Sequence, residues 1–173
     1  MRVLGISGAL NHDAALSIVE DERILYASHS ERYSRKKNDP LLNNGIVNAA
    51  LEYGKPDVIA WYERPLVKKT RQIYAGQYGL AFDPEEMPKR YIKDNFPQLV
   101  GIPIEYQSHH YTHAASGYFT SNLAHAAVLV IDSIGEWETL TIWKGWGNKL
   151  KKVYSQSYPD SVGFFYSAMT QRL

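Results

Sequence analysis

Three histidines stand close together in the segment 108–114, which reads SHHYTHA. His109 and His113 are four residues apart, so on a helix their side chains project from the same face, one turn apart. Two imidazoles in that arrangement can bind one metal ion. His110, three residues before His113, is an alternative partner, and a purely structural alternative is that the histidines cap the helix or pack against a sheet. A zincin-type protease is not indicated, because His110 replaces the glutamate that follows the first histidine in that motif.

A carboxylate follows the apolar run of residues 126–131. Asp132 is succeeded by Ser133, Ile134, Gly135 and Glu136. A carboxylate at the end of a buried strand, beside a glycine-containing turn, is a typical position for metal or phosphate chemistry. The alternative is an ordinary β-turn in which the Asp132 carboxylate accepts backbone N–H bonds.

Two segments near the amino terminus are candidates for anion binding. Residues 5–13 read GISGALNHD, where small residues let a ligand approach the backbone and His12 can exchange a proton or donate to a developing negative charge. This loop lacks the lysine of a Walker motif and the dinucleotide glycine pattern. Four cations fall within six residues from Arg32 to Lys37. Such a run is usually a solvated face, but just after an expected strand it can also form an anion clamp. We expect a second basic stretch, residues 64–71, to face solvent.

The composition limits the class of protein. The chain has 173 residues, of which 45% are hydrophobic and 21% charged, which is enough to form one compact core. Nineteen basic against eighteen acidic residues argue against a nucleic-acid binder held by a basic surface. The absence of cysteine excludes disulfides, thiolate zinc sites and a cysteine nucleophile. No apolar run is long enough for a membrane span or a signal peptide, so we expect a cytoplasmic protein without membrane contact.

Hydrophobic periodicity predicts an α/β fold with a mixed sheet. A β-β-β-α-β order is expected first, with strands at 3–8, 14–20, 23–27 and 57–62 and a helix at 41–51. Helical pieces at 64–99 form an insertion, followed by a strand at 102–106 and a helix at 109–118. A second three-stranded meander is expected at about 126–158, with strands at 126–131, 137–143 and 150–158, a turn at 145–148, and a helix from residue 162 onward.

Five segments in collinear order resemble the amino-terminal part of the O-carbamoyltransferases of nodulation-factor and antibiotic biosynthesis. They are GISG…NHDAA at 5–15, SERYSRKK at 30–37, HHYTHAAS at 109–116, IDSIGEW at 131–137 and SVGFFYSAMT at 161–170. That family looks related to the tRNA threonylcarbamoyl-adenosine synthesis proteins and, more distantly, to sugar kinases, actin and Hsp70. The resemblance implies a ribonuclease-H-like fold, the first half of a duplicated domain that closes on ATP.

The resemblance also implies a domain assignment. Residues 1–173 would form the amino-terminal portion of the ATP-binding domain of a carbamoyltransferase. Proteins of this family are several times longer, so the chain is expected to be a truncated or split piece. Its partner would be the missing carboxy-terminal half or a complementing chain, without which we expect the piece to be inactive.

The implied reaction forms carbamoyl adenylate from carbamoyl phosphate and ATP, and then transfers the carbamoyl group to a hydroxyl of a sugar or natural product. A divalent metal, Fe²⁺, Mn²⁺ or Zn²⁺, would be bound by His109, His113 and Asp132. His12 would transfer a proton or stabilise an oxyanion. The residues expected to contact phosphate-bearing substrates are Arg35, Lys37, Glu31 and Arg32 for carbamoyl phosphate, and Gly8, Asn11, Gly135 and Glu136 for ATP with Mg²⁺.

Two departures from the family and two rival functions stay open at this stage. Ser7 stands where kinase relatives have the aspartate of an Asp-Gly pair, and Ser133 stands where glycine is common, which narrows the second phosphate turn. One rival is a small-molecule kinase or ATPase of the same fold, which would need no imidazole ligands. The other is a non-catalytic half-domain that binds a partner.

Overall fold

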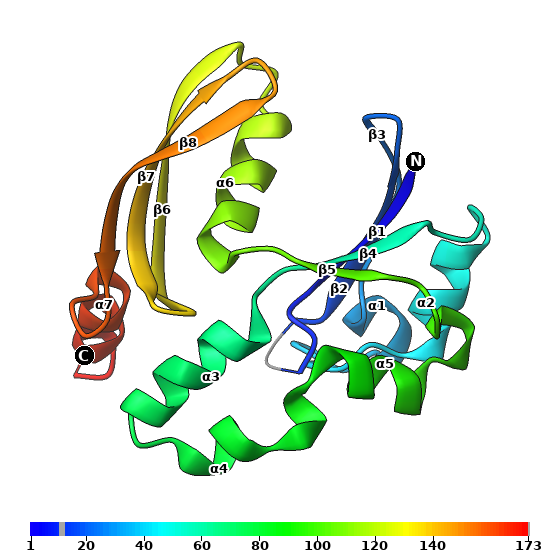
Figure 1. Cartoon of the computed structure of the whole chain (residues 1–173), viewed down its shortest axis with the longest axis horizontal. Helices are drawn as coiled ribbons and strands as arrows, with labels where there is room; N and C mark the ends of the chain where they lie inside the picture. Colours follow the sequence, from blue (N-terminus) through cyan, green and yellow to red (C-terminus); the bar gives the residue numbers. More distant parts are fainter. Residues whose placement is uncertain (11–12, 173) are drawn as a thin grey trace. The chain divides into compact units, whose positions relative to one another are not determined.

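The structure is a computed structural model that describes residues 1–10 and 13–172 (Figure 1). The chain divides into two compact units. The first contains residues 1–65 and 82–107, and the second contains residues 66–81 and those from 108 onward. The expected insertion at 64–99 is helical, as predicted, but it is divided between the two units.

The first unit contains a mixed five-stranded sheet in the order β3-β2-β1-β4-β5. Strands β1 (Arg2–Ser7), β2 (Ala15–Glu20) and β3 (Arg23–His29) form an antiparallel meander, whereas β4 (Val58–Trp61) and β5 (Ile104–Tyr106) add in parallel. This arrangement confirms the predicted mixed sheet and the predicted parallel addition after the first meander.

Helices complete the core of the first unit. They are α1 (Glu31–Ser34), α2 (Asn44–Leu51) and α5 (Pro88–Asn95), with 3₁₀ turns η1 (Pro84–Glu86) and η2 (Pro97–Leu99). Helix α2 begins where the Asn43 side chain accepts a hydrogen bond from the N–H of Ile46. The fully buried side chains include Leu4, Ile18, Ile46, Ile59, Trp61 and Leu99. The apolar face of α2 therefore packs into one core with the sheet.

The second unit contains a three-stranded antiparallel sheet, β6-β7-β8. Its elements are α3 (Pro65–Tyr74), α4 (Tyr78–Phe82), α6 (His109–Phe119), β6 (His125–Gly135), β7 (Glu138–Trp146), β8 (Lys149–Ser157) and α7 (Val162–Thr170), except that the first residue of α3 and the last residue of α4 are counted with the first unit. The second predicted meander is confirmed. The predicted end of the first strand at Ile131 is wrong, because β6 continues to Gly135, which pairs with Glu138. The turn predicted at 145–148 is shorter, since β7 extends to Trp146.

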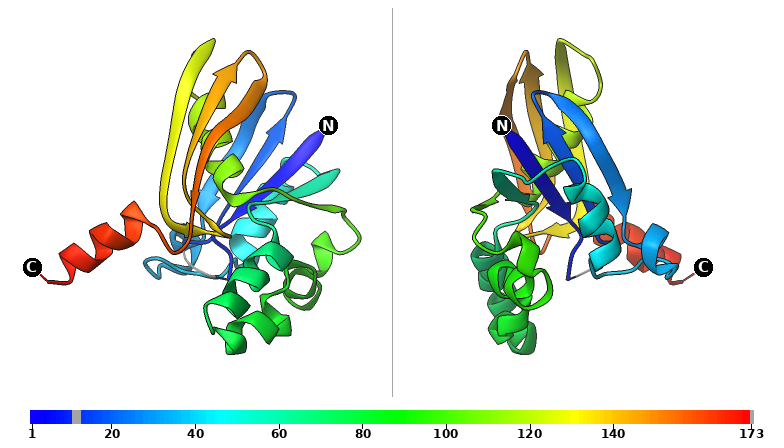
Figure 2. Two further views of the ribbon diagram at one scale, coloured as in Figure 1. Left: turned by 60° about the vertical axis from the view of Figure 1, so that its left-hand side comes forward. Right: turned by 90° about the vertical axis from the view of Figure 1, so that its right-hand side faces the viewer.

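Helix α6 packs along one face of this sheet (Figure 1). Ala114 of α6 is buried together with Val130 of β6 and Trp143 of β7. Helix α7 leads away from the end of the sheet, and none of its residues is buried (Figure 2). Among the residues that the structure describes, no helix combines the length and apolar character needed to cross a bilayer.

Candidate metal centre

His109, His113 and Asp132 bring three potential ligand atoms together in the second unit. Nε2 of His109 lies 3.0 Å from Oδ2 of Asp132 and 3.1 Å from Nε2 of His113. Nε2 of His113 is 3.9 Å from the same carboxylate oxygen. One ligand atom from each residue lies within 4.8 Å of the others. The structure therefore assembles the three residues that the sequence singled out, although their role as ligands stays a prediction.

His110 points elsewhere. Its side chain is fully buried, and Nδ1 lies 2.9 Å from Oγ1 of Thr141, which also accepts a hydrogen bond from the Trp143 indole N–H at 2.8 Å. Burial lowers the pKa of His110, which favours the neutral imidazole. The structural alternative thus holds for His110, which packs against the sheet, while His109 and His113 share the face toward Asp132.

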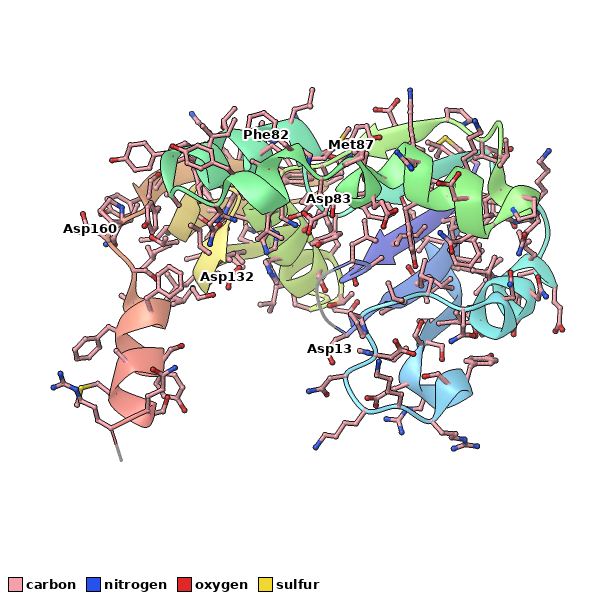
Figure 3. All side chains as sticks on the ribbon, turned by 90° about the horizontal axis from the view of Figure 1, so that it is seen from below. Asp13, Phe82, Asp83, Met87, Asp132 and Asp160 are labelled. Atoms are coloured by element: carbon pink, nitrogen blue, oxygen red, sulfur yellow. The ribbon has the colours of Figure 1, made fainter. Side chains whose placement is uncertain are left out.

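The Asp132 carboxylate is ionised over the whole neutral range. The hydrogen bond from His109 is the largest cause that lowers its pKa to about 2, against the opposing effect of burial. The N–H of Ser133 donates to Oδ1 at 2.7 Å, so Oδ2 is the oxygen that faces the two imidazoles. Figure 3 shows Asp132 on β6, at the end of the sheet near α7. A negatively charged oxygen beside two imidazoles is a donor set that binds divalent metals.

The start of α6 is held by two side-chain caps. Ser108 Oγ accepts a hydrogen bond from the N–H of Tyr111, and Oε1 of Glu136 accepts one from the N–H of His109 at 3.2 Å. Glu136 is buried and has a left-handed backbone, φ +53°. The carboxylate also complements the positive end of the helix dipole. Glu136, predicted as a nucleotide contact, therefore also fixes the residue that carries the first imidazole.

Arg71 is tied to the same hairpin. Its Nε donates to the carbonyl oxygen of Glu136 at 3.1 Å, and its Nη1 donates to Gln77 Oε1 at 2.8 Å. In the same helix, Lys69 Nζ donates to the carbonyl of Ala81 at 2.9 Å. The expectation that residues 64–71 simply face solvent is wrong for these two cations, because both bond to backbone carbonyls of the second unit.

Two glycines permit close approaches that the sequence analysis did not assign. A Cβ atom at Gly135 would overlap the ring of His109, and one at Gly163 would lie 2.5 Å from the carbonyl oxygen of Asp132. Beside Gly163, Ser161 Oγ donates to Ser133 O at 2.7 Å and accepts from the N–H of Phe164. Helix α7 is thereby fastened to the strand segment that carries Asp132. Both Ser161 and Gly163 lie in the segment SVGFFYSAMT of the family resemblance, where a serine before an apolar run is a typical helix cap.

The remaining predicted residues that the structure describes belong to the first unit. Gly8 is buried with φ +71°, while Asn11 and His12 lie outside the described residues. Arg35 ends helix α1 in a left-handed conformation, and the side chains of Arg35 and Lys37 are exposed. The two other predicted phosphate contacts are Glu31 and Arg32. Oε2 of Glu31 accepts a hydrogen bond from the N–H of Asn38 at 3.1 Å, and Nη2 of Arg32 lies 3.7 Å from Oε1 of Glu31. Their binding roles stay predictions.

Comparison with known proteins identifies the family. The profile described as "Carbamoyltransferase N-terminus" matches residues 60–173, which include α6, Asp132 and α7. The chain belongs to the carbamoyltransferase family. The part of the family that it matches is the amino-terminal domain. This result confirms the family resemblance deduced from the five segments.

Individual relatives extend the match over nearly the whole chain. An uncharacterized protein of Synechocystis, sll1178, is 33% identical over 97% of the chain, and an uncharacterized protein of Methanocaldococcus jannaschii, MJ1051, is 28% identical over 99%. The nodulation protein NolNO of Sinorhizobium fredii is 25% identical over 96%. The chain spans only 31%, 30% and 28% of the lengths of these three proteins, respectively.

Proposed function

We propose that this chain supplies the metal-binding part of an O-carbamoyltransferase that forms carbamoyl adenylate and passes the carbamoyl group to a hydroxyl of a sugar or natural product. The observation that carries the proposal is the convergence of His109, His113 and Asp132 in a domain of the carbamoyltransferase family. A small-molecule kinase would need only nucleotide-bound Mg²⁺, for which imidazole ligands have no use.

The three donor atoms fit a first-row divalent ion. Two imidazole nitrogens and one carboxylate oxygen suit Fe²⁺, Mn²⁺ or Zn²⁺ better than Ca²⁺, which prefers oxygen ligands alone. Bound there, the ion would act as a Lewis acid that polarises a phosphate or carbamoyl oxygen. Three protein ligands leave coordination positions for substrate, or for a further ligand from the rest of the protein.

The proposed reaction balances when water takes part. Because both phosphate and pyrophosphate are released, the phosphate of carbamoyl phosphate passes to water, and the resulting carbamate oxygen attacks the α-phosphorus of ATP and displaces pyrophosphate. The acceptor hydroxyl then attacks the carbamoyl carbon, loses its proton and releases AMP. Cations are needed at both phosphate-releasing steps, because negative charge develops on phosphate oxygens.

The other predicted residues take their roles from this scheme. We assign Arg35 and Lys37, with Glu31 and Arg32, to the phosphate of carbamoyl phosphate, and His12 to proton transfer or oxyanion stabilisation. The proposed contacts of ATP with its Mg²⁺ are Gly8, Asn11, Gly135 and Glu136.

The fold proposal follows from the repeated meander. Each unit contains three antiparallel strands in chain order, β1-β2-β3 and β6-β7-β8, as a ribonuclease-H-like duplication requires. The relatives are about three times longer than the matched region, which supports a complementing polypeptide as partner.

Metal binding by the isolated chain tests the central assignment. Titration with Mn²⁺ and Zn²⁺, followed by calorimetry, should give one site per chain that His113→Ala and His109→Ala each remove. His125→Ala, which changes an exposed histidine outside the group of three, is the matched control and should bind normally. Undiminished binding by the His113→Ala variant would contradict the assignment.

A further inference from the structure

The face of the β6-β7-β8 sheet opposite α6 is apolar and exposed. The pairing register aligns Leu129, Ile142 and Tyr154 in one cross-strand row, and Ile131 with Leu140 in the next. Leu129 is 58% exposed and Ile131 is 51% exposed. An antiparallel sheet with one solvated face normally alternates apolar residues inward with polar residues outward. Here the outward positions in the middle of the sheet are apolar too, so this face has the composition of a buried surface.

Two lysines border this apolar surface. The next row on the same face begins at Ala127, two residues before Leu129 on β6. In this row Lys144 of β7 is paired directly with Lys151 of β8. Like charges in opposite positions of neighbouring strands destabilise a sheet. In the described part of the chain neither lysine forms an ion pair with a carboxylate, and Lys144 instead lies 5.9 Å from the centre of the Trp146 ring. Acidic side chains of a bound polypeptide would therefore relieve the repulsion between these two lysines.

A hollow opens at the junction of the apolar rows and the lysine pair. Its volume is about 490 Å³, and its lining includes Ala127, Ile142, Lys144 and Val153. That space admits side chains of a docked segment, which would bury the apolar rows while its acidic residues meet the lysines.

We propose that this face, defined by Leu129, Ile131, Ile142, Tyr154, Lys144 and Lys151 and termed the open face, binds a polypeptide segment with an apolar stripe flanked by acidic residues. The occupant is the polypeptide that the family relatives carry outside the aligned region. These relatives align with 96–99% of this chain, yet the larger part of each lies outside the match. The inference rests on the proposed function only for the identity of this occupant.

A second copy of the chain fits the open face less well. The outward residues in the paired rows from Ala127 to Ile131 are apolar, amide or lysine, with no acid among them. Two open faces packed together would therefore bring four lysines and no carboxylate into a desolvated contact, which is costly for unpaired charges.

Co-expression tests the proposal. The tagged 173-residue chain is expressed together with the untagged part of the Synechocystis relative that lies outside the aligned region. The two should copurify in a one-to-one complex identified by mass. Leu129→Asp should weaken the complex at least about tenfold, because it places a charge in the apolar row. Ile24→Asp, a matched change at a 61% exposed position of β3 in the first unit, should have no effect.

A charge variant keeps the test independent of folding defects. The double change Lys144→Glu with Lys151→Glu should weaken the complex and reduce its dependence on salt, since the proposed contacts are electrostatic. Lys55→Glu, an exposed change in the first unit, is the control. Circular dichroism checks that each variant is folded.

Three results would overturn the proposal. They are failure of the wild-type chains to copurify, full retention of the complex by both the Leu129→Asp and double lysine variants, and a homodimer of this chain that Leu129→Asp dissociates. Complex formation needs no metal and no substrate. A complex that forms but transfers no carbamoyl group would therefore contradict the proposed function and leave the docking surface intact.

Discussion

Gly135 lies directly against the imidazole of His109, in a place where any Cβ atom would overlap the ring. The neighbouring Glu136 carboxylate holds the backbone N–H of His109. One short stretch of the β6–β7 hairpin thus determines both where α6 begins and where its first imidazole can lie. The ring of His109 is in turn within 3.0 Å of Asp132, on the same strand as Gly135.

Replacement of Gly135 by alanine should damage the metal centre more than the fold. The three atoms nearest to such a Cβ all belong to the His109 side chain, so the ring can rotate away without backbone movement. We expect metal affinity to fall by about 10- to 100-fold, the usual effect of changing a residue that orients a ligand. Calorimetric titration measures it, with Gly79→Ala, where nothing lies within 4 Å, as control. Normal affinity would show that the ring position is not required.

Replacement of Gly163 by alanine should instead damage the fold more than the metal centre. Here the Cβ atom would come within 2.5 Å of the Asp132 carbonyl oxygen and the Ser133 nitrogen. Both are backbone atoms, so they can move aside only if the main chain of β6 shifts. We expect a loss of about 1–3 kcal/mol in the free energy of unfolding, despite the higher helix propensity of alanine. Urea denaturation measures it.

The control for that variant is Gly117→Ala in helix α6. Apart from the neighbouring residues and the backbone of α6 itself, no atom lies within 4 Å of a Cβ at Gly117, so only helix propensity acts there. A gain of about 0.5–1 kcal/mol is expected. Equal responses of the two glycines would refute a steric role for Gly163 in fastening α7 to the Asp132 strand.

Local patterns predicted the elements and the candidate ligands because both depend on short-range periodicity. The alternating strands of the two meanders and the four-residue spacing of His109 and His113 are of this kind. The short helix α1, Glu31–Ser34, was missed because four residues show no apolar period. The end of β6 was misplaced because Gly135 joins the strand through its partner Glu138 on β7.

Contacts between distant residues could not be predicted in the same way. The choice between His109 and His110 depends on which face of α6 meets Thr141, a residue of β7. Arg71 was expected to face solvent, yet it bonds to Glu136, 65 positions later in the sequence. Both outcomes follow from tertiary packing, which a single sequence does not show.

Glu138 should make the stability of the second unit depend on pH. Burial alone would raise its pKa, but hydrogen bonds from Lys152 and Ser155 outweigh burial and lower the pKa from 4.5. A group with a lowered pKa stabilises the folded state above its unfolded pKa, and this stability is lost as pH falls through the folded pKa. The contribution of Glu138 is therefore present at neutral pH and disappears below about pH 4.5.

Urea denaturation of the wild type and Glu138→Gln across this range measures the effect. The variant should be less stable at pH 7, and the difference should shrink as the pH falls below 4.5. Glu105→Gln serves as the control, because Glu105 is exposed and an exposed carboxylate contributes little to the free energy of unfolding. A stability difference that is constant with pH would rule out the charged form of Glu138 as its source.

Arg35 and Lys37 are expected to bind phosphate, although both side chains are exposed. Arg35 follows helix α1 directly, and the Glu31 carboxylate fixes the returning backbone at Asn38, so both ends of this short basic segment are anchored. A charge-assisted hydrogen bond to phosphate contributes about 1.5–3 kcal/mol, so Arg35→Ala and Lys37→Ala should each weaken carbamoyl phosphate binding about ten- to hundredfold.

The control for these two variants is Lys93→Ala in α5, because an exposed charge that is not anchored contributes almost nothing to binding. Binding is measured by NMR titration of the complex with the co-expressed partner. If Lys93→Ala has the larger effect, or if neither change in 35–37 matters, the phosphate contacts lie elsewhere in the protein.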